Sequence, residues 1–100
     1  MNETEQSLAL QRLESHRDRL KRIDEQILRI LVRRDSVSME VAEVKKTLER
    51  PSLDELQEEV MIKARRNMAD ALGLDPDYAE GVFRAVHDHS VEVQEAYRQA

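Results

Sequence analysis

The sequence contains no cysteine, only two glycines and two prolines, and no excess of basic residues. Without cysteine, a disulfide framework, a thiolate nucleophile and a zinc–thiolate site are all excluded. The net charge of -5 argues against a general nucleic-acid or anionic-membrane binder. No apolar run approaches the length of a membrane span, and the first ten residues lack the basic and apolar segments of a signal peptide. We therefore expect a cytoplasmic protein with no nucleic-acid or membrane partner.

Glycine and proline are also absent from the first 50 residues, where apolar residues recur at spacings of three and four. This pattern predicts one helix over about residues 7–48. At 1.5 Å per residue the helix would be roughly 60 Å long, about twice the width of a compact domain of this size. Such a helix cannot bury its apolar stripe on its own chain. The sequence therefore predicts a pair of chains joined through their long helices.

A second helix is predicted after Pro51, which ends the first one. Ser52 and Glu55 have the spacing of a capping box, and they predict a helix over about residues 53–72. Gly73 suits the left-handed residue that follows a helix end.

A third helix is predicted over about residues 76–98. Asp75 is a suitable N-cap residue, and Pro76 is favoured at the first helical position. Strand signals and internal repeats are absent from the sequence. We therefore expect a single all-α domain over residues 1–100, with one long and two shorter helices.

Arg34 occupies the apolar seam of the long helix, seven residues after Ile27 and seven before Val41. Lys45 lies eleven residues further on, close to three helical turns, and so returns to nearly the same face. An arginine in a seam can extend outward or specify register. Two long cations on one face can instead converge on a small anion, which offsets the cost of their desolvation. Arg17 is about 42 Å from Lys45 along the helix, so it could join such a site only from a second chain.

Polar pairs at a spacing of four also occur in both shorter helices. Ser90 and Gln94 interrupt the apolar side of the third helix, and Asp54 and Glu58 place two carboxylates on one face of the second. Taken singly, Ser90 and Gln94 are explained by hydrogen bonds within the fold. The two acids are explained by their favourable interaction with the helix dipole. Their joint occurrence with the cations indicates a site.

The sequence closely resembles the all-helical AroQ-class chorismate mutases from about residue 13 to residue 94. The resemblance rests on the segments HRDRLKRIDEQILRILVRRDSVSMEVAEVK, RPSLD, GLDPDY and VFRAVHDHSVEVQ. It also rests on an ordered set of polar residues: Arg17, Arg34, Lys45, Asp54, Glu58, Ser90 and Gln94. The resemblance implies an intertwined homodimer that converts chorismate to prephenate in aromatic amino-acid biosynthesis.

The resemblance also implies how the cations bind the substrate, a small dianion. Arg17 of one protomer and Arg34 of the other would grip its two carboxylates. Lys45 and Gln94 would donate hydrogen bonds to its ether oxygen, with Lys45 also near a carboxylate. Arg34 would then lie in the seam because the substrate is its counterion.

The remaining roles concern the ring end of the substrate. By the same resemblance, Asp54 and Glu58 line the ring-hydroxyl end of the site, and Ser90 supports the carboxylate side. Gln57 departs from the family pattern, because many members carry an arginine there. Without that cation an ammonium on the ring would be better tolerated, so a 4-amino-4-deoxychorismate mutase is an alternative. An isochorismate pyruvate lyase ranks after it, because lyases of this fold do not keep both acids.

A non-enzyme alternative is an acidic helical dimerisation or adaptor module. Such a module would be expected to carry an aliphatic residue at Arg34 and to direct Ser90 and Gln94 outward. The inward placement of all three favours the enzyme. Neither a metal nor a cofactor is predicted, because His87 and His89 point about 200° apart on a helix and cannot chelate one ion together.

Overall fold

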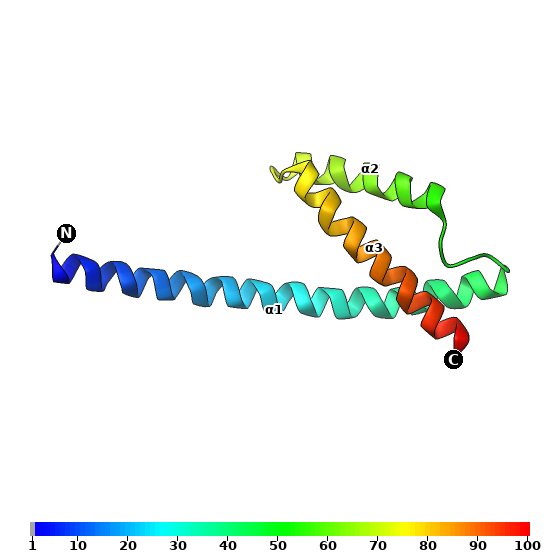
Figure 1. Ribbon diagram of the computed structural model, residues 1–100, viewed down its shortest axis with the longest axis horizontal. Coiled ribbons are helices and arrows are strands. Elements are labelled where there is room, and N and C mark those ends of the chain that lie inside the picture. The colour runs from blue at the N-terminus through cyan, green and yellow to red at the C-terminus, as the bar shows by residue number, and fades with distance from the viewer. Residues whose placement is uncertain (1) are drawn as a thin grey trace. The chain divides into compact units, whose positions relative to one another are not determined.

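The computed structural model describes residues 2–100, which form three α-helices and no β-strand. α1 spans Glu3–Thr47, α2 spans Glu55–Ala71 and α3 spans Pro76–Gln99 (Figure 1). The predicted all-α fold with one long and two shorter helices is therefore confirmed. None of the helices in residues 2–100 is long and apolar enough to cross a membrane.

The chain divides into two units, and the boundary falls within α1, between Arg34 and Asp35. The prediction of a single domain over residues 1–100 stays a prediction. In the first unit the apolar seam of α1 is largely exposed: Leu13, Leu20 and Ile27 keep 43%, 59% and 49% of their surface. This stretch of helix needs a further surface to bury its seam.

The second unit contains the end of α1 together with α2 and α3. Its buried apolar residues are mostly small, which allows the helices to approach closely: Ala42, Ile62, Ala69 and Ala79. Arg66 of α2 connects the two shorter helices through ion pairs of 2.9 Å to Asp77 and 3.0 Å to Glu80. The core of this unit is small, and it positions the residues of the candidate site.

The connection from α2 to α3 follows the sequence prediction. Gly73 has a φ of 78°, the left-handed conformation that glycine adopts without steric cost. The side chain of Asp75 accepts a hydrogen bond from the backbone N–H of Asp77 at 2.9 Å, and Pro76 is the first residue of α3. The predicted N-cap and the predicted glycine are therefore confirmed.

The predicted capping box at the start of α2 is wrong. Asp54 caps the helix instead, because its Oδ1 accepts a hydrogen bond from the backbone N–H of Gln57 at 3.0 Å. Ser52 is buried, and its hydroxyl accepts a hydrogen bond from Arg98 Nη1 at 3.2 Å. A serine that meets the end of α3 in this way is no longer available to cap α2.

Candidate active site

Lys45 begins a chain of hydrogen bonds that joins α1 to α3. Its ammonium donates to the backbone carbonyl of Ser52 at 2.8 Å and to Gln94 Oε1 at 3.0 Å. Gln94 Nε2 donates in turn to Ser90 Oγ at 3.2 Å. The hydroxyls of Ser90 and Ser38 lie 2.7 Å apart. Two direct partners, one in the turn after α1 and one in α3, therefore hold the Lys45 ammonium, and Ser90 in turn holds Gln94.

The polar residues of this chain lie inside the protein. Ser38, Ser52, Ser90 and Gln94 are each at most 6% exposed. Buried polar groups are costly unless they are hydrogen-bonded, so a satisfied chain of this kind fixes the geometry of its members. The inward orientation predicted for Ser90 and Gln94 is confirmed.

Two donors in the chain retain unused hydrogens. An ammonium has three hydrogens, of which Lys45 uses two, and an amide has two on nitrogen, of which Gln94 uses one. Each group can therefore donate one further hydrogen bond without breaking those that hold it. Two such donors, bonded to each other, can converge on a single oxygen atom of a ligand.

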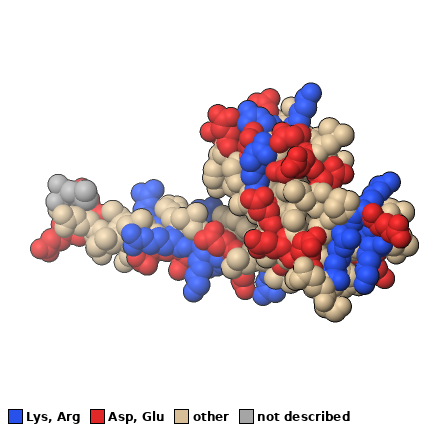
Figure 2. Space-filling view, turned by 45° about the vertical axis from the view of Figure 1, so that its right-hand side comes forward, with Lys and Arg blue, Asp and Glu red and all other residues tan. Residues whose placement is uncertain are grey.

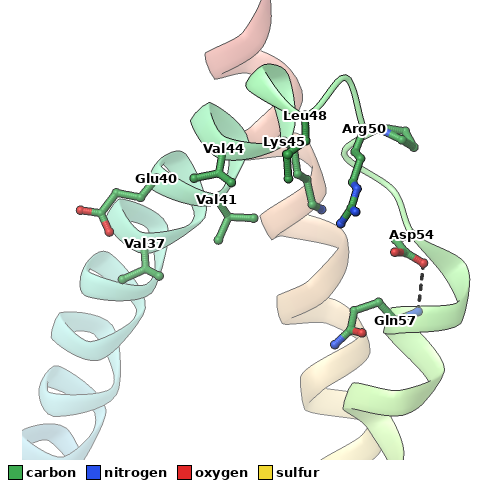
Figure 3. A pocket seen from close by; sticks show the side chains of 10 residues that line it. Val37, Glu40, Val41, Val44, Lys45, Leu48, Arg50, Asp54 and Gln57 are labelled. Carbon is green, nitrogen blue, oxygen red and sulfur yellow. Dashed lines mark hydrogen bonds between the residues drawn. The ribbon is translucent and has the colours of Figure 1, made fainter.

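Lys45 lies on the wall of a pocket of about 700 Å³ within the second unit (Figure 3). One side of the pocket is the apolar end of α1, and the other side is the turn and the start of α2. The lining consists of Val37, Glu40, Val41, Val44, Lys45, Leu48, Arg50, Pro51, Asp54 and Gln57. Apolar walls with a few polar groups are typical of sites for small molecules.

The overall charge of this protein does not attract anions, so an anion must bind through cations in a local site such as this pocket. On the face shown in Figure 2, acidic and basic side chains are interspersed, and the net charge is -5. Long-range attraction of an anion is therefore weak, and specific cations must bind it at close range. Burial lowers the pKa of Lys45 below its usual 10.5, as does the charge of Arg98 more weakly, while Asp54 raises it in part.

Three of the predicted site residues line this pocket, namely Lys45, Asp54 and Gln57. Ser90 and Gln94 are connected to it through the hydrogen bonds of Lys45. The Asp54 carboxylate is exposed and caps α2 through one oxygen, as the dashed line in Figure 3 marks. Its other oxygen can accept a hydrogen bond from a ligand.

Glu58 is oriented toward α3 and is not part of the pocket lining. Its Oε1 accepts a hydrogen bond from Arg84 Nη1 at 3.2 Å, and its Oε2 lies 3.5 Å from His87 Nε2. Arg84 also binds Glu80 at 2.9 Å and Glu59 at 3.3 Å. The α3 cation Arg84 thus binds Glu58 behind the start of α2.

The two predicted arginines at the carboxylates belong to the first unit. Arg17 Nη1 forms an ion pair with Glu14 at 2.9 Å on the exposed surface of α1. Arg34 is half-buried. Their joint action with Lys45 stays a prediction.

The sequence analysis missed three residues that belong to this region. Ser38 and Ser52 bind the predicted site residues Ser90 and Lys45, and Arg50 lines the pocket. Ser38 binds a residue 52 positions away, and Ser52 binds Lys45 through its backbone carbonyl, so no side-chain pattern indicated either serine. Arg50 carried a readable signal, because it is a cation directly before Pro51, the proline that was predicted to end the first helix.

No group of three or more histidines or acids that could hold a metal ion occurs in the part of the chain that the structure describes. The pocket offers one ammonium, one guanidinium, two carboxylates and one amide. Cations suit a carboxylate ligand, and the remaining groups suit a hydroxyl or ammonium.

Comparison with known proteins assigns the family. The sequence model of chorismate mutase type II matches residues 16–95. The T-protein of Enterobacter agglomerans is 37% identical over 70 residues, which cover 70% of this chain and 19% of that protein. The chain thus spans about a fifth of the length of this relative. The protein belongs to the chorismate mutase type II family, as its resemblance to the AroQ class predicted.

Proposed function

We propose that the chain is a chorismate mutase, which rearranges chorismate to prephenate. The reaction is intramolecular: the C–O bond to the ether oxygen breaks while a C–C bond forms, and no group leaves the molecule. It needs no nucleophile or general base. The enzyme must hold the enolpyruvyl side chain over the ring and stabilise the charge that grows on the ether oxygen.

The observation that carries this proposal is the bonded pair of Lys45 and Gln94 at the pocket. Each retains one hydrogen that it can donate, and their mutual bond fixes both in advance. Donors fixed before the reaction stabilise a developing oxyanion without reorganisation. The ether oxygen of chorismate would lie between the Lys45 ammonium and the Gln94 amide.

The carboxylates of chorismate require cations beyond Lys45. We propose that the protein is a homodimer and that Arg34 and the partner's Arg17 bind them, since guanidinium groups match carboxylates in bidentate geometry. The exposed seam of α1, with Leu13, Leu20 and Ile27 about half accessible, supports a second copy as its cover.

The proposal is tested by the initial rate of loss of chorismate absorbance with purified protein. Prephenate should be identified as the product by chromatography, and 4-amino-4-deoxychorismate should be assayed in parallel. Saturable formation of prephenate would support the mutase. A folded protein that converts neither compound would contradict the proposed activity and favour the alternative of a dimerisation or adaptor module.

Gln57 gives a specific reason to assay the amino compound. It lines the pocket as a neutral group, close in sequence to the acid Asp54, so that end of the pocket opposes an ammonium less than an arginine would. We expect Gln57→Arg to lower kcat/KM for 4-amino-4-deoxychorismate by about tenfold relative to chorismate, because the two cations repel each other. Gln57→Lys serves as a second variant of the same charge, and Gln57→Glu as the variant of opposite charge. An unchanged ratio in all three would remove Gln57 from substrate selection.

The lowered pKa of Lys45 predicts an alkaline limit to activity. The ammonium must be charged to donate, so kcat/KM should fall as pH rises through a pKa below the usual 10.5 of lysine. The bound dianion favours the charged lysine, so kcat itself should fall only at higher pH. Lys45→Arg should abolish this fall in activity at alkaline pH, because arginine stays protonated. If the alkaline fall in kcat/KM persists unchanged in Lys45→Arg, it must be caused by another titrating group.

A further inference from the structure

The turn at the end of α1 brings Arg50 back over Lys45. The backbone N–H of Arg50 donates to the carbonyl of Lys45 at 2.8 Å, and that of Glu49 donates to Lys46 at 3.1 Å. These two bonds define a Schellman motif, in which the second residue after the helix end returns to the third residue before it. The turn therefore brings Lys45 and Arg50, which are five residues apart in the sequence, close together.

This turn is formed by an unfavourable residue. Glu49 occupies the left-handed position with a φ of 57°, and it is the only non-glycine residue among 2–100 with positive φ. Glycine is preferred at such a position, whereas a residue with a Cβ is strained there. Backbone strain of this kind is often retained where it positions a functional group. Pro51 then restricts the backbone of Arg50 to extended conformations.

The Arg50 side chain extends from this turn toward the space that Lys45, Asp54 and Gln57 line (Figure 3). The structure assigns its guanidinium no hydrogen bond or ion pair with a side chain of residues 2–100. Asp54, the predicted acid in the lining, caps α2 through one oxygen and forms no ion pair with Arg50. Of the two cationic side chains that line the pocket, that of Lys45 alone has a hydrogen-bond partner among residues 2–100.

We propose that Arg50 is a substrate-binding residue that grips a carboxylate of the dianion beside Lys45. The inference rests on the proposed function, since it assigns a further contact in the same site. An exposed arginine in the pocket lining is expected to bind substrate and transition state alike, so its contribution falls on KM.

The test compares Arg50→Ala and Arg50→Gln with Lys46→Ala. Lys46 is the matched control, because it carries the same charge on the same turn but does not line the pocket. We expect both Arg50 variants to raise KM for chorismate about tenfold with kcat within about threefold of wild type, as the loss of one charge-assisted hydrogen bond implies. Arg50→Lys should recover part of this loss, and the Arg50 variants should show a weaker rise of KM with added sodium chloride.

Binding of prephenate, measured by calorimetry, provides a second readout that does not depend on turnover. It should weaken in the Arg50 variants and not in Lys46→Ala. An active wild-type enzyme whose KM is unchanged in both Arg50 variants, or equally raised in Lys46→Ala, would overturn the inference and leave the proposed function intact. A wild-type protein that neither converts chorismate nor binds prephenate would overturn the proposed function, and this inference with it.

Discussion

Lys45→Ala is expected to lower kcat for chorismate on the order of several hundredfold, with the helical fold retained. The ammonium is the only charged donor that the Lys45–Gln94 pair offers to the ether oxygen. Removing one fixed donor from a developing oxyanion typically costs about 3 to 4 kcal/mol of transition-state stabilisation. The substitution also removes the donor that holds Gln94 Oε1, so the amide can turn away from the position that the reaction requires.

The measurement is kcat by the absorbance assay, together with far-ultraviolet circular dichroism and the melting temperature. The lost hydrogen bonds to Ser52 and Gln94 should lower stability by about 1 to 3 kcal/mol, so the assay temperature must lie well below the melting transition. Lys46→Ala removes the neighbouring, exposed lysine and should leave kcat unchanged. A folded Lys45→Ala protein with near-normal turnover would refute the assignment of this residue.

The sequence predicts those parts of the fold that depend on local geometry. Gly73 and Asp75 were identified correctly because a left-handed residue and an N-cap each satisfy groups a few positions away. Ser52 was assigned wrongly for a related reason. Its spacing to Glu55 fits a capping box, but a tertiary contact with Arg98 takes the hydroxyl, and Asp54 caps the helix.

The candidate site is only partly readable from the sequence. Spacing placed Ser90 and Gln94 on one inward face, and both are buried. It could not reveal that Ser38 and the carbonyl of Ser52 complete their hydrogen bonds, since these partners lie 52 and 7 residues away from the groups that they bind. Arg50 escaped notice because the left-handed residue before it is a glutamate, whereas glycine usually marks a Schellman turn.

Arg17→Ala is expected to lower kcat/KM on the order of a hundredfold, because a substrate carboxylate loses its bidentate partner. The variant should fold normally, since among residues 2–100 the Arg17 side chain is bound by one exposed ion pair to Glu14, which adds little to stability. The decisive experiment uses a mixed dimer in which one chain carries Arg17→Ala and the other carries Lys45→Ala. The two chains carry different tags and are co-expressed, and the mixed dimer is isolated by successive affinity steps.

Symmetry determines the expected activity of this mixed dimer. If each site takes Arg17 from one protomer and Lys45 from the other, one site lacks both residues and the other is intact, so about half of wild-type activity per dimer should return. The matched control combines Lys45→Ala with Arg34→Ala. Both residues are predicted to serve the same site from the same protomer, so each site of that dimer is damaged and no activity should return. Recovery in the first dimer and not in the second would place Arg17 across the interface. A first dimer as inactive as its parents would mean that every site draws both residues from one chain, and the exposed seam of α1 would then need another explanation than a shared active site.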